Sequence, residues 1–417
     1  MHVLNESHIL LFLLQFSVLL ACARTLGVIS EELGIPALAG EIIAGILLGP
    51  TVFGRFAPEA QSWLFPHESI QNTMLETVSW LGVFFLLLAS GFHVNFRKAL
   101  QSGHAALSIG IIGVLVPIAF GVLAFWRVHE SYFGPAANRV SFSLFLAVAA
   151  SITAISVVAR VLDDLNLTQT DDSNLALSAC AVNDLFGWLL FTVVLSLASG
   201  NSVNNTQLAT NFVITLCFVA TCIIIGAPII NYAARFIQRT NLENAKALQT
   251  LIISVGLLCG AITQWLGIHA ILGFFLAGTM VGSAKEVGKK MTKSFADTSH
   301  AIFVPIFFAT IGLNLDFISG MELGITTLFM TVAIGGKFIG AWIGARLGKR
   351  NNSKSILMGL IFTPGGAMEI VVGALALEIK LIDQRTFVAI VFAALVSSII
   401  AGPAVGTWIK KIERQQN

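Results

Sequence analysis

Apolar segments long enough to cross a lipid bilayer follow one another along almost the whole chain. Of its 417 residues, 56% are hydrophobic and 11% are charged, whereas a soluble domain usually carries about 25% charged residues. A helix needs about 20 apolar residues to cross the hydrocarbon core, and fewer where it is broken or surrounded by protein. The composition therefore excludes a soluble globule and predicts an all-α polytopic membrane protein.

Thirteen spans are predicted, joined by short links. They lie near residues 8–30, 35–50, 73–93, 103–126, 141–161, 173–199, 208–235, 246–265, 268–283, 299–318, 324–346, 355–377 and 386–409. We expect residues 1–417 to form a single transmembrane domain, with no soluble regulatory domain in this chain.

The distribution of basic residues predicts the orientation. With thirteen spans the two termini lie on opposite sides. If the C-terminus is cytoplasmic, eighteen of the 24 Lys and Arg residues fall on the cytoplasmic side, five fall outside, and only Lys337 lies within a span. This asymmetry follows the positive-inside rule. We expect an integral membrane protein with its N-terminus outside and its C-terminus in the cytoplasm, in the cell (inner) membrane if the source is bacterial.

The two halves of the chain contain similar segments in the same order. "IPALAGEIIAGILLGP" resembles "GIHAILGFFLAGTMVG", and "VFFLLLASGFHVNF" resembles "VPIFFATIGLNLDF". Corresponding segments lie seven spans apart, an odd number that inverts the second copy in the membrane. We place repeat 1 at about 35–199 and repeat 2 at about 268–410. Inverted repeats with interrupted helices in matching positions are typical of secondary transporters, whose site lies where the two breaks meet.

Each half contains one segment that is expected to interrupt its helix. In "LIFTPGGAMEIVVGAL", Pro364 removes a backbone donor, and Gly365 and Gly366 weaken the helix. In "AVAASITAISVVARVL", Ser151 and Thr153 are polar but no Pro or Gly is present, so this break is predicted from the repeat alone. The alternative for both segments is a kinked packing helix whose Ser and Thr side chains bond to their own turns.

Asp184 lies near the middle of the span predicted at 173–199, beside Asn183. A carboxylate at that depth is costly unless something compensates its charge, so it marks a functional site by default. One ionisable group beside one neutral amide indicates a site where a cation and a proton compete. Thr153 and the carbonyl groups freed by the helix breaks are expected to replace part of the hydration shell of the ion.

Three other charged residues lie within predicted spans. Lys337 is either a counter-charge that stabilises the crossed broken helices or a proton carrier, and we expect it to face a carboxylate or carbonyl groups. Glu369 follows the glycine pair and is expected to cap the freed helix start, where negative charge is favourable. Glu41 could belong to a proton path, lie on a dimer face shielded from lipid, or be a partner for a backbone amide, and we interpret it as structural. Gly45 and Gly278 belong to glycine pairs spaced four apart that permit close helix packing.

Several other functional classes have no support in the sequence. The motifs GxxxxGK[ST], HExxH, GxSxG and GxGxxG do not occur, and the five cysteines have no metal-ligand spacing. The formal net charge of +2 gives no reason to expect a nucleic-acid partner. We expect a protein that is not an enzyme and needs no cofactor besides the ions it transports.

The chain resembles the monovalent cation:proton antiporter-2 family, which is sodium/hydrogen exchanger-like and includes plant cation/proton exchangers and bacterial relatives. The segments "GEIIAGILLGP", "SITAISVVARVL", "SACAVND", "GIHAILGFFLAG", "PIFFATIGLNLD" and "GGAMEIVV" carry the resemblance in the family's order over nearly the whole chain. The resemblance implies a transport core that moves against a dimerisation domain, usually within a homodimer.

The resemblance also implies roles for individual residues. Asp184 corresponds to the carboxylate that binds the ion and the proton, and Asn183 to its partner. Thr153 lies in the first helix crossover, the glycine pair 365–366 lies in the second, and Lys337 corresponds to the lysine of the core. Electrogenic relatives have a second Asp where this chain has Asn183, so the resemblance argues against a two-proton cycle.

We therefore expect a secondary antiporter that exchanges Na⁺ or K⁺ for H⁺, electroneutrally, by alternating access around Asp184. A gated cation channel on the same scaffold is one alternative, but it needs a continuous polar pore, and a single mid-membrane carboxylate argues against it. A symporter for an organic anion is another, but it needs more polar groups at the crossover. Saturable flux that requires an opposing pH gradient would indicate an antiporter and not a channel. Gradient-driven uptake of organic anions would indicate the symporter.

Overall fold

The computed structural model describes residues 5–66, 68–94, 103–167, 170–198, 205–240 and 244–416. Within these ranges the chain is helical apart from its links, and the only strand-like pairing is an isolated bridge between Phe133 and Ile382. Eleven described helices are long and apolar enough to cross a membrane, or twelve if one bent pair counts as a span, and the apolar helix Ala270–Ser283 is shorter. The predicted all-α polytopic class is confirmed, and the count of thirteen spans is approximate.

The chain divides into two compact units. Unit 1 comprises Met1–Ala89 and Gly288–Met321, and unit 2 comprises Ser90–Val287 and Glu322–Asn417. Unit 1 contains α1 (Glu6–Glu32), α2 (Ala37–Leu48), α3 (Phe53–Phe56), α4 (Pro58–Leu64), most of α5 (Ser69–Gly91), α15 (Lys289–Thr298), the π-helical turn η3 (Ser299–Phe303), α16 (Val304–Asn314) and α17 (Phe317–Gly320).

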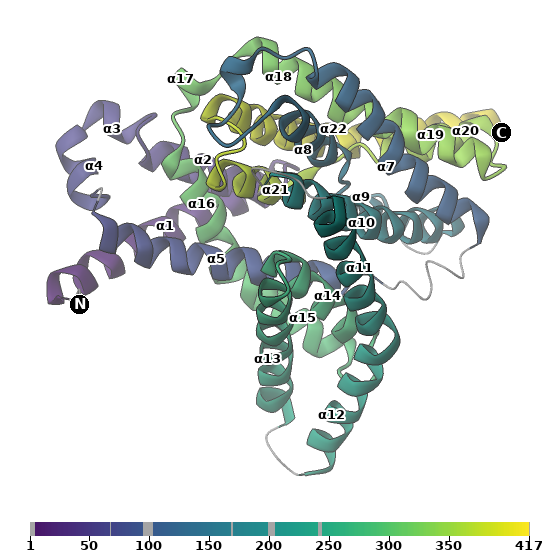
Figure 1. Ribbon diagram of the computed structural model, residues 1–417, viewed down its shortest axis with the longest axis horizontal. Helices are drawn as coiled ribbons and strands as arrows, with labels where there is room; N and C mark the ends of the chain where they lie inside the picture. The colour runs from purple at the N-terminus through teal and green to yellow at the C-terminus, as the bar shows by residue number, and fades with distance from the viewer. Residues whose placement is uncertain are drawn as a thin grey trace. The chain divides into compact units, whose positions relative to one another are not determined.

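The helices of unit 2 follow in Figure 1 from blue through green to yellow. They are α7 (His104–Phe125), η1 (Glu130–Tyr132), α8 (Arg139–Ser151), α9 (Ile155–Asp164), α10 (Asp171–Ala198), α11 (Asn205–Thr221), η2 (Cys222–Gly226), α12 (Ala227–Arg239), α13 (Asn244–Trp265), α14 (Ala270–Ser283), α18 (Leu323–Met330), η4 (Thr331–Gly336), α19 (Lys337–Leu347), α20 (Asn352–Ile361), α21 (Gly366–Glu378) and α22 (Gln384–Gln416).

Glycines allow helices that lie far apart in the sequence to pack closely. In unit 1, a Cβ atom added to Gly45 of α2 would collide with the backbone of Ala309 on α16. In unit 2, a Cβ atom added to Gly91, at the end of α5, would collide with the backbone of Phe275 and lie 2.8 Å from Cα of Gly278 on α14. Within unit 1, α2 therefore packs closely on α16, and within unit 2 the end of α5 packs closely on α14. The predicted role of Gly45 and Gly278 in close packing is confirmed.

Glu41 of α2 is buried in unit 1 with 3% exposure. Its Oε1 lies 3.6 Å from Nη1 of Arg24 on α1, and the same Arg24 nitrogen donates to the carbonyl of His300 at 3.4 Å. The Cγ of Glu41 also lies where a Cβ on Gly27 would contact it, at 3.3 Å. The ion pair with Arg24 supports a structural role for Glu41, through a partner that the sequence did not predict.

In unit 2, glycines four residues apart bring α19 against α7. A Cβ on Gly340 would lie 3.2 Å from Cα of Gly113, and a Cβ on Gly344 would lie 2.7 Å from Cα of Ile109. Lys337 begins α19 directly after the π-helical turn η4. Turns of this kind are often found at functional positions within helices. The close contact with α7 fixes α19, and so fixes the position of Lys337.

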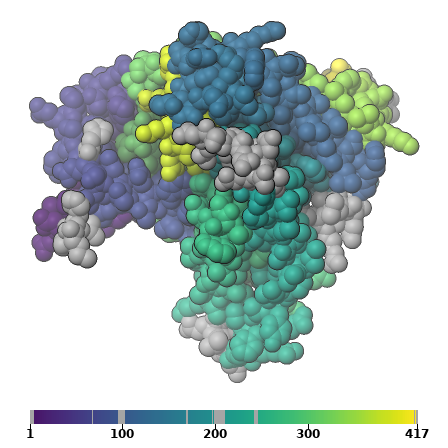
Figure 2. All heavy atoms as spheres, viewed as in Figure 1, coloured from purple at the N-terminus to yellow at the C-terminus, as the bar shows by residue number. Residues whose placement is uncertain are grey.

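Large apolar side chains are exposed on the segment from α11 to α13, which is teal in Figure 2. Val213, Ile224, Ile229, Leu258 and Trp265 are each between 55% and 84% exposed. A soluble monomer rarely exposes so many large apolar groups on one segment. These side chains are suited to contact lipid, in agreement with the membrane class.

Candidate functional site

Two helices of unit 2 are broken in their middles. α8 ends at Ser151, residues 152–154 are not helical, and α9 begins at Ile155. α20 ends at Ile361 and α21 begins at Gly366, with a bend of 49° between their axes. The first break, which the sequence predicted only through the repeat, is therefore confirmed. Both broken helices begin with a capping Asn: Asn138 accepts a hydrogen bond from the backbone of Ser141, and Asn351 from that of Lys354.

The two breaks contact each other directly. The backbone N–H of Ala154 donates to the carbonyl of Pro364 at 3.1 Å, and the hydroxyl of Thr153 donates to the carbonyl of Phe362 at 3.1 Å. Gly366 has a φ of +57°, and a Cβ there would lie 2.9 Å from that of Ala154. Only glycine adopts this conformation at little cost and leaves room for the opposite chain. Each break thus supplies polar partners for backbone groups that the other break exposes.

Asn183 and Asp184 lie on α10 beside this crossover. Oδ1 of Asn183 accepts a hydrogen bond from the backbone N–H of Thr153 at 3.3 Å, so the amide is tied to the first break. Asp184 is 2% exposed, and neither of its oxygens has a hydrogen-bond partner among the described residues. Nδ2 of Asn183 also has none. Buried carboxylates are normally paired, so this one is unusual.

Lys337 and Glu369 form a second buried centre at the crossover. Their side chains are fully buried, and Nζ of Lys337 lies 3.7 Å from Oε2 of Glu369. The same Nζ donates to the carbonyl of Ile152, in the first break, at 3.4 Å. A Cβ on Gly365 would collide with the Glu369 carboxylate and lie 3.1 Å from Nζ of Lys337. Gly365 therefore leaves the space that the pair occupies.

These contacts decide some of the roles predicted from sequence. We expected Lys337 to face a carboxylate or carbonyl groups, and it faces the Glu369 carboxylate and the Ile152 carbonyl. Glu369 does not cap α21 as expected: its oxygens make no hydrogen bond within the described structure and lie beside Lys337 instead. The hydroxyl of Ser151 bonds to the carbonyl of Val148 in its own turn at 2.7 Å, so that residue shows the local bonding named as the alternative.

Sequence reasoning missed Ser397 of α22, whose hydroxyl accepts a hydrogen bond from the backbone N–H of Gly365 at 3.2 Å. Two adjacent serines, Ser397 and Ser398, in the middle of an apolar span were the available signal. A third helix, α22, thus provides a hydrogen-bond partner for the backbone of the second break.

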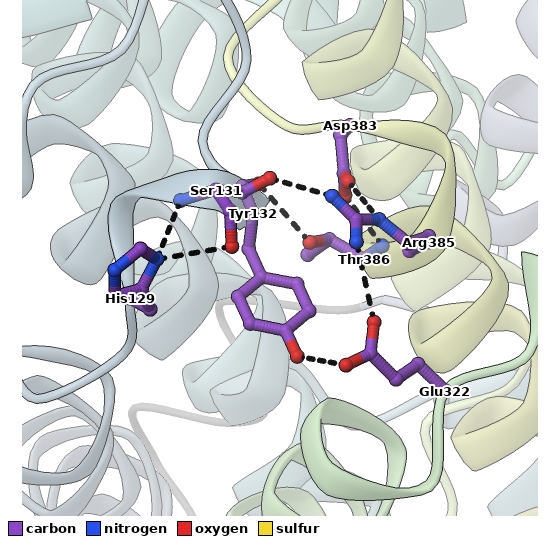
Figure 3. A network of polar contacts seen from close by, with 7 residues as sticks. All are labelled: His129, Ser131, Tyr132, Glu322, Asp383, Arg385 and Thr386. Atoms are coloured by element: carbon purple, nitrogen blue, oxygen red, sulfur yellow. Dashed lines mark hydrogen bonds and ion pairs between the residues drawn. The ribbon is translucent and has the colours of Figure 1, made fainter.

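Polar residues from three places in unit 2 meet in a group that we call the polar brace (Figure 3). They come from the link after α7, from the residue before α18, and from the link after α21 with the start of α22. The group consists of His129, Ser131, Tyr132, Glu322, Asp383, Arg385 and Thr386. The guanidinium of Arg385 contacts the carboxylates of Asp383 at 2.8 Å and Glu322 at 3.4 Å. It also lies 5.0 Å from the ring of Tyr132, whose hydroxyl donates to the Glu322 carboxylate. The brace therefore holds the link before α8 against the link after α21, near the isolated bridge of Phe133.

The brace changes the titration of Tyr132, which lies outside the spans. The hydrogen bond to the Glu322 carboxylate stabilises the neutral phenol and raises the pKa of Tyr132 above its usual value. Burial adds to this rise, and the guanidinium of Arg385 opposes it by favouring the phenolate.

The comparisons with known proteins agree with this architecture. A family model described as "Sodium/hydrogen exchanger, transmembrane" matches residues 17–411. The chain is also similar to the solved structure of the sodium proton antiporter MjNhaP1 from Methanocaldococcus jannaschii, with a TM-score of 0.70 over 96% of this chain and 97% of that one. At 14% sequence identity this likeness shows the fold.

Characterised relatives carry antiporter names. Cation/H(+) antiporter 18 of Arabidopsis thaliana is 30% identical over 97% of this chain and 50% of the relative. Na(+)/H(+) antiporter NhaS4 of Synechocystis is 25% identical over 96% of this chain and 98% of the relative. The chain therefore spans about half the length of the plant relatives and nearly the full length of the cyanobacterial one.

The buried pair predicts a non-additive double-mutant cycle. Lys337→Met and Glu369→Gln should each lower stability by about 3–5 kcal/mol, because each leaves one buried charged group without its partner. The double variant should lose much less than the sum of the two. Melting temperatures of the four proteins in one detergent measure this. Additive losses would show that the two side chains do not act as a pair.

The polar brace predicts a tyrosine titration that depends on Glu322. The chain has two tyrosines, and Tyr232→Phe, at an exposed position, leaves Tyr132 as the single phenol. Ultraviolet absorbance during alkaline titration should show Tyr132 ionising above the usual value near 10. Adding Glu322→Gln should lower the pKa, because the carboxylate that stabilises the neutral phenol is gone. An unchanged titration midpoint in that variant would contradict the hydrogen bond.

Proposed function

The chain belongs to the sodium/hydrogen exchanger transmembrane family, and we propose that it is a secondary antiporter that exchanges Na⁺ or K⁺ for H⁺ at Asp184. The family consists of transporters rather than enzymes. The names of the relatives support cation and proton substrates, since they include a yeast K(+)/H(+) antiporter and a cyanobacterial Na(+)/H(+) antiporter. The observation that carries the proposal is a buried carboxylate, beside two crossed helix breaks, with no hydrogen-bond partner among the described residues.

The proposed exchange follows from the free-energy cost of burying the ionised Asp184 carboxylate. An ionised Asp184 without a partner is unfavourable in apolar surroundings, so it is stable only when it holds a proton or a cation. The two occupants use the same oxygens and exclude each other. The site therefore passes between a protonated and a cation-loaded form and avoids the empty charged form. This mutual exclusion couples the two fluxes.

Neighbouring oxygens offset the loss of water by the ion. Hard cations prefer oxygen ligands, and the carbonyls of the two breaks and the hydroxyl of Thr153 are candidate ligands, since Asn183, next to Asp184, bonds to Thr153. Asn183 carries no charge. Its contribution is to position Thr153, whose backbone N–H donates a hydrogen bond to Oδ1 of Asn183. Asn183, Thr153 and Asp184 thus act as one group in the proposal, with the glycine pair 365–366 and Ser151 supporting the crossover.

Lys337 has its own counter-charge, which supports electroneutral exchange. Because Glu369 lies 3.7 Å from Lys337, the ammonium does not need Asp184 as a partner. If the pair keeps its protons throughout the cycle, its charge is the same in both half-cycles. Asp184 then carries the same net charge with a proton as with a monovalent cation, so one cation exchanges for one proton.

The proposed antiporter lies in the membrane with its N-terminus outside and its C-terminus in the cytoplasm, as the 18-to-5 distribution of basic residues supports. A homodimer is proposed from the resemblance stated above. The antiporter alternates between two accessible faces around Asp184.

Asp184→Asn should abolish exchange without lowering stability. The variant keeps the shape of the side chain and removes the charge that both ions require, and it also removes a costly buried carboxylate. Dequenching of a pH dye in proteoliposomes, with Na⁺ and K⁺ in turn, should fall to the level of liposomes without protein. Asp171→Asn, the same change at the exposed start of α10, is the matched control and should exchange normally. Near-normal exchange by Asp184→Asn would refute the site.

Exchange should not depend on the membrane potential. A potential of 100 mV acts with about 2.3 kcal/mol on each charge that crosses, but no net charge crosses in a one-for-one cycle. The measurement is proton-coupled flux in proteoliposomes whose potential is set by an ionophore for an ion that is not a substrate. A sustained rate change with potential, together with matching current on a solid-supported membrane, would reject electroneutrality and assign proton release to the Lys337–Glu369 pair.

A further inference from the structure

Unit 1 contains a polar cavity that the proposed exchange site does not use. It has a volume of about 270 Å³ and is lined from α1, α4, α5 and α16. Its polar walls include Gln15, Gln61, Gln71, Glu76 and Thr310. All of its lining residues belong to unit 1, whereas Asp184 belongs to unit 2. Buried polar groups on transmembrane helices usually have a hydrogen-bond partner.

Two backbone carbonyls fix the amide groups in this cavity. Nε2 of Gln15 donates to the carbonyl of Leu64 at 2.7 Å, which leaves Oε1 of Gln15 as an acceptor. Nε2 of Gln71 donates to that oxygen at 3.1 Å and to the carbonyl of His8 at 3.3 Å. These two hydrogen bonds fix the orientation of the Gln71 amide and leave its Oε1 as the polar atom that can still accept a hydrogen bond.

Two residues that line the cavity each have a buried oxygen without a hydrogen-bond partner among the described residues. Gln71 is 1% exposed and Thr310 is 5% exposed. Oε1 of Gln71 and Oγ1 of Thr310 make no hydrogen bond with any described residue. Buried polar atoms of this kind usually bind an ordered water molecule or an ion. The cavity far exceeds the roughly 30 Å³ that one water molecule occupies in the liquid.

The charge of the cavity favours a cation. Among the described residues that line it, Glu76 is the one ionisable group and is exposed, and none is Lys, Arg or His. One carboxylate, one hydroxyl oxygen and one amide oxygen that two hydrogen bonds orient offer the oxygen ligands and the single charge that suit an alkali cation. An anion would meet the carboxylate with no positive group to compensate it.

We propose that this cavity is a second site for a monovalent cation, Na⁺ or K⁺, which it holds together with part of the ion's hydration shell. Oε1 of Gln71 and Oγ1 of Thr310 contact the ion or its water, and Glu76 balances its charge. The proposal does not depend on exchange at Asp184.

The test measures cation binding when the exchange site is disabled. Purified Asp184→Asn protein in detergent is equilibrated with radioactive sodium, or with radioactive rubidium as the probe for potassium, and saturable binding is measured. The variant should retain a saturable site for at least one of the two ions. Adding Glu76→Gln should weaken that binding about tenfold or more, the equivalent of about 1.4 kcal/mol. Asp184→Asn protein that binds neither ion saturably would overturn the proposal.

Two further variants separate binding from folding. Thr310→Val in the Asp184→Asn background removes a hydroxyl that has no protein partner, so it should weaken binding without lowering the melting temperature. Glu59→Gln, the same charge change at an exposed residue of α4 outside the cavity, is the matched control and should bind as the parent does. If Glu76→Gln and Thr310→Val both bind as tightly as the parent, the cavity holds water only and the proposal is wrong.

Discussion

Backbone groups exposed by a broken helix must find partners inside the protein, because the membrane interior provides none. An unpaired amide or carbonyl there costs several kcal/mol. The two breaks meet this requirement through each other: Ala154 donates to Pro364, and the hydroxyl of Thr153 donates to Phe362. Neither broken helix can be replaced by a straight one without leaving the other break unpaired. The placement of Asn183 and Lys337 depends on this mutual satisfaction, since each bonds to the first break.

The buried charges of unit 2 have two different solutions. The opposite charges of Lys337 and Glu369 neutralise each other, so the pair can hold the crossover together without leaving a net charge there. Asp184 has no such partner within the part of the chain that the structure describes, and mobile ions take that place in the proposed function. The difference explains how one small region can combine a rigid crossover with an exchangeable charge: the fixed charges are paired, and the functional one is left unpaired.

Sequence alone indicated much of the fold and part of the site, for reasons that particular residues make clear. Low charge and long apolar segments predicted the class, and the glycines next to Pro364 predicted the second break, because these are local properties. The pairing of Lys337 with Glu369, the bond from Gly365 to Ser397 and the polar brace were not predicted. Each of them joins residues distant in sequence, and their meeting depends on how the helices cross. The glycines predicted close packing, but not that α2 would pack on α16.

The packing of α2 on α16 has a consequence for biosynthesis. Within unit 1, the hydroxyl of Thr51 binds the carbonyl of Leu315, 264 residues later in the chain, close to where Gly45 meets α16. At about 5–20 residues per second, a ribosome needs roughly 15 to 50 s to add that much chain. During this interval α1 and α2 are already made while α16 does not exist. Lipid or an insertion chaperone must therefore cover the glycine face of α2 until the C-terminal half of the protein arrives.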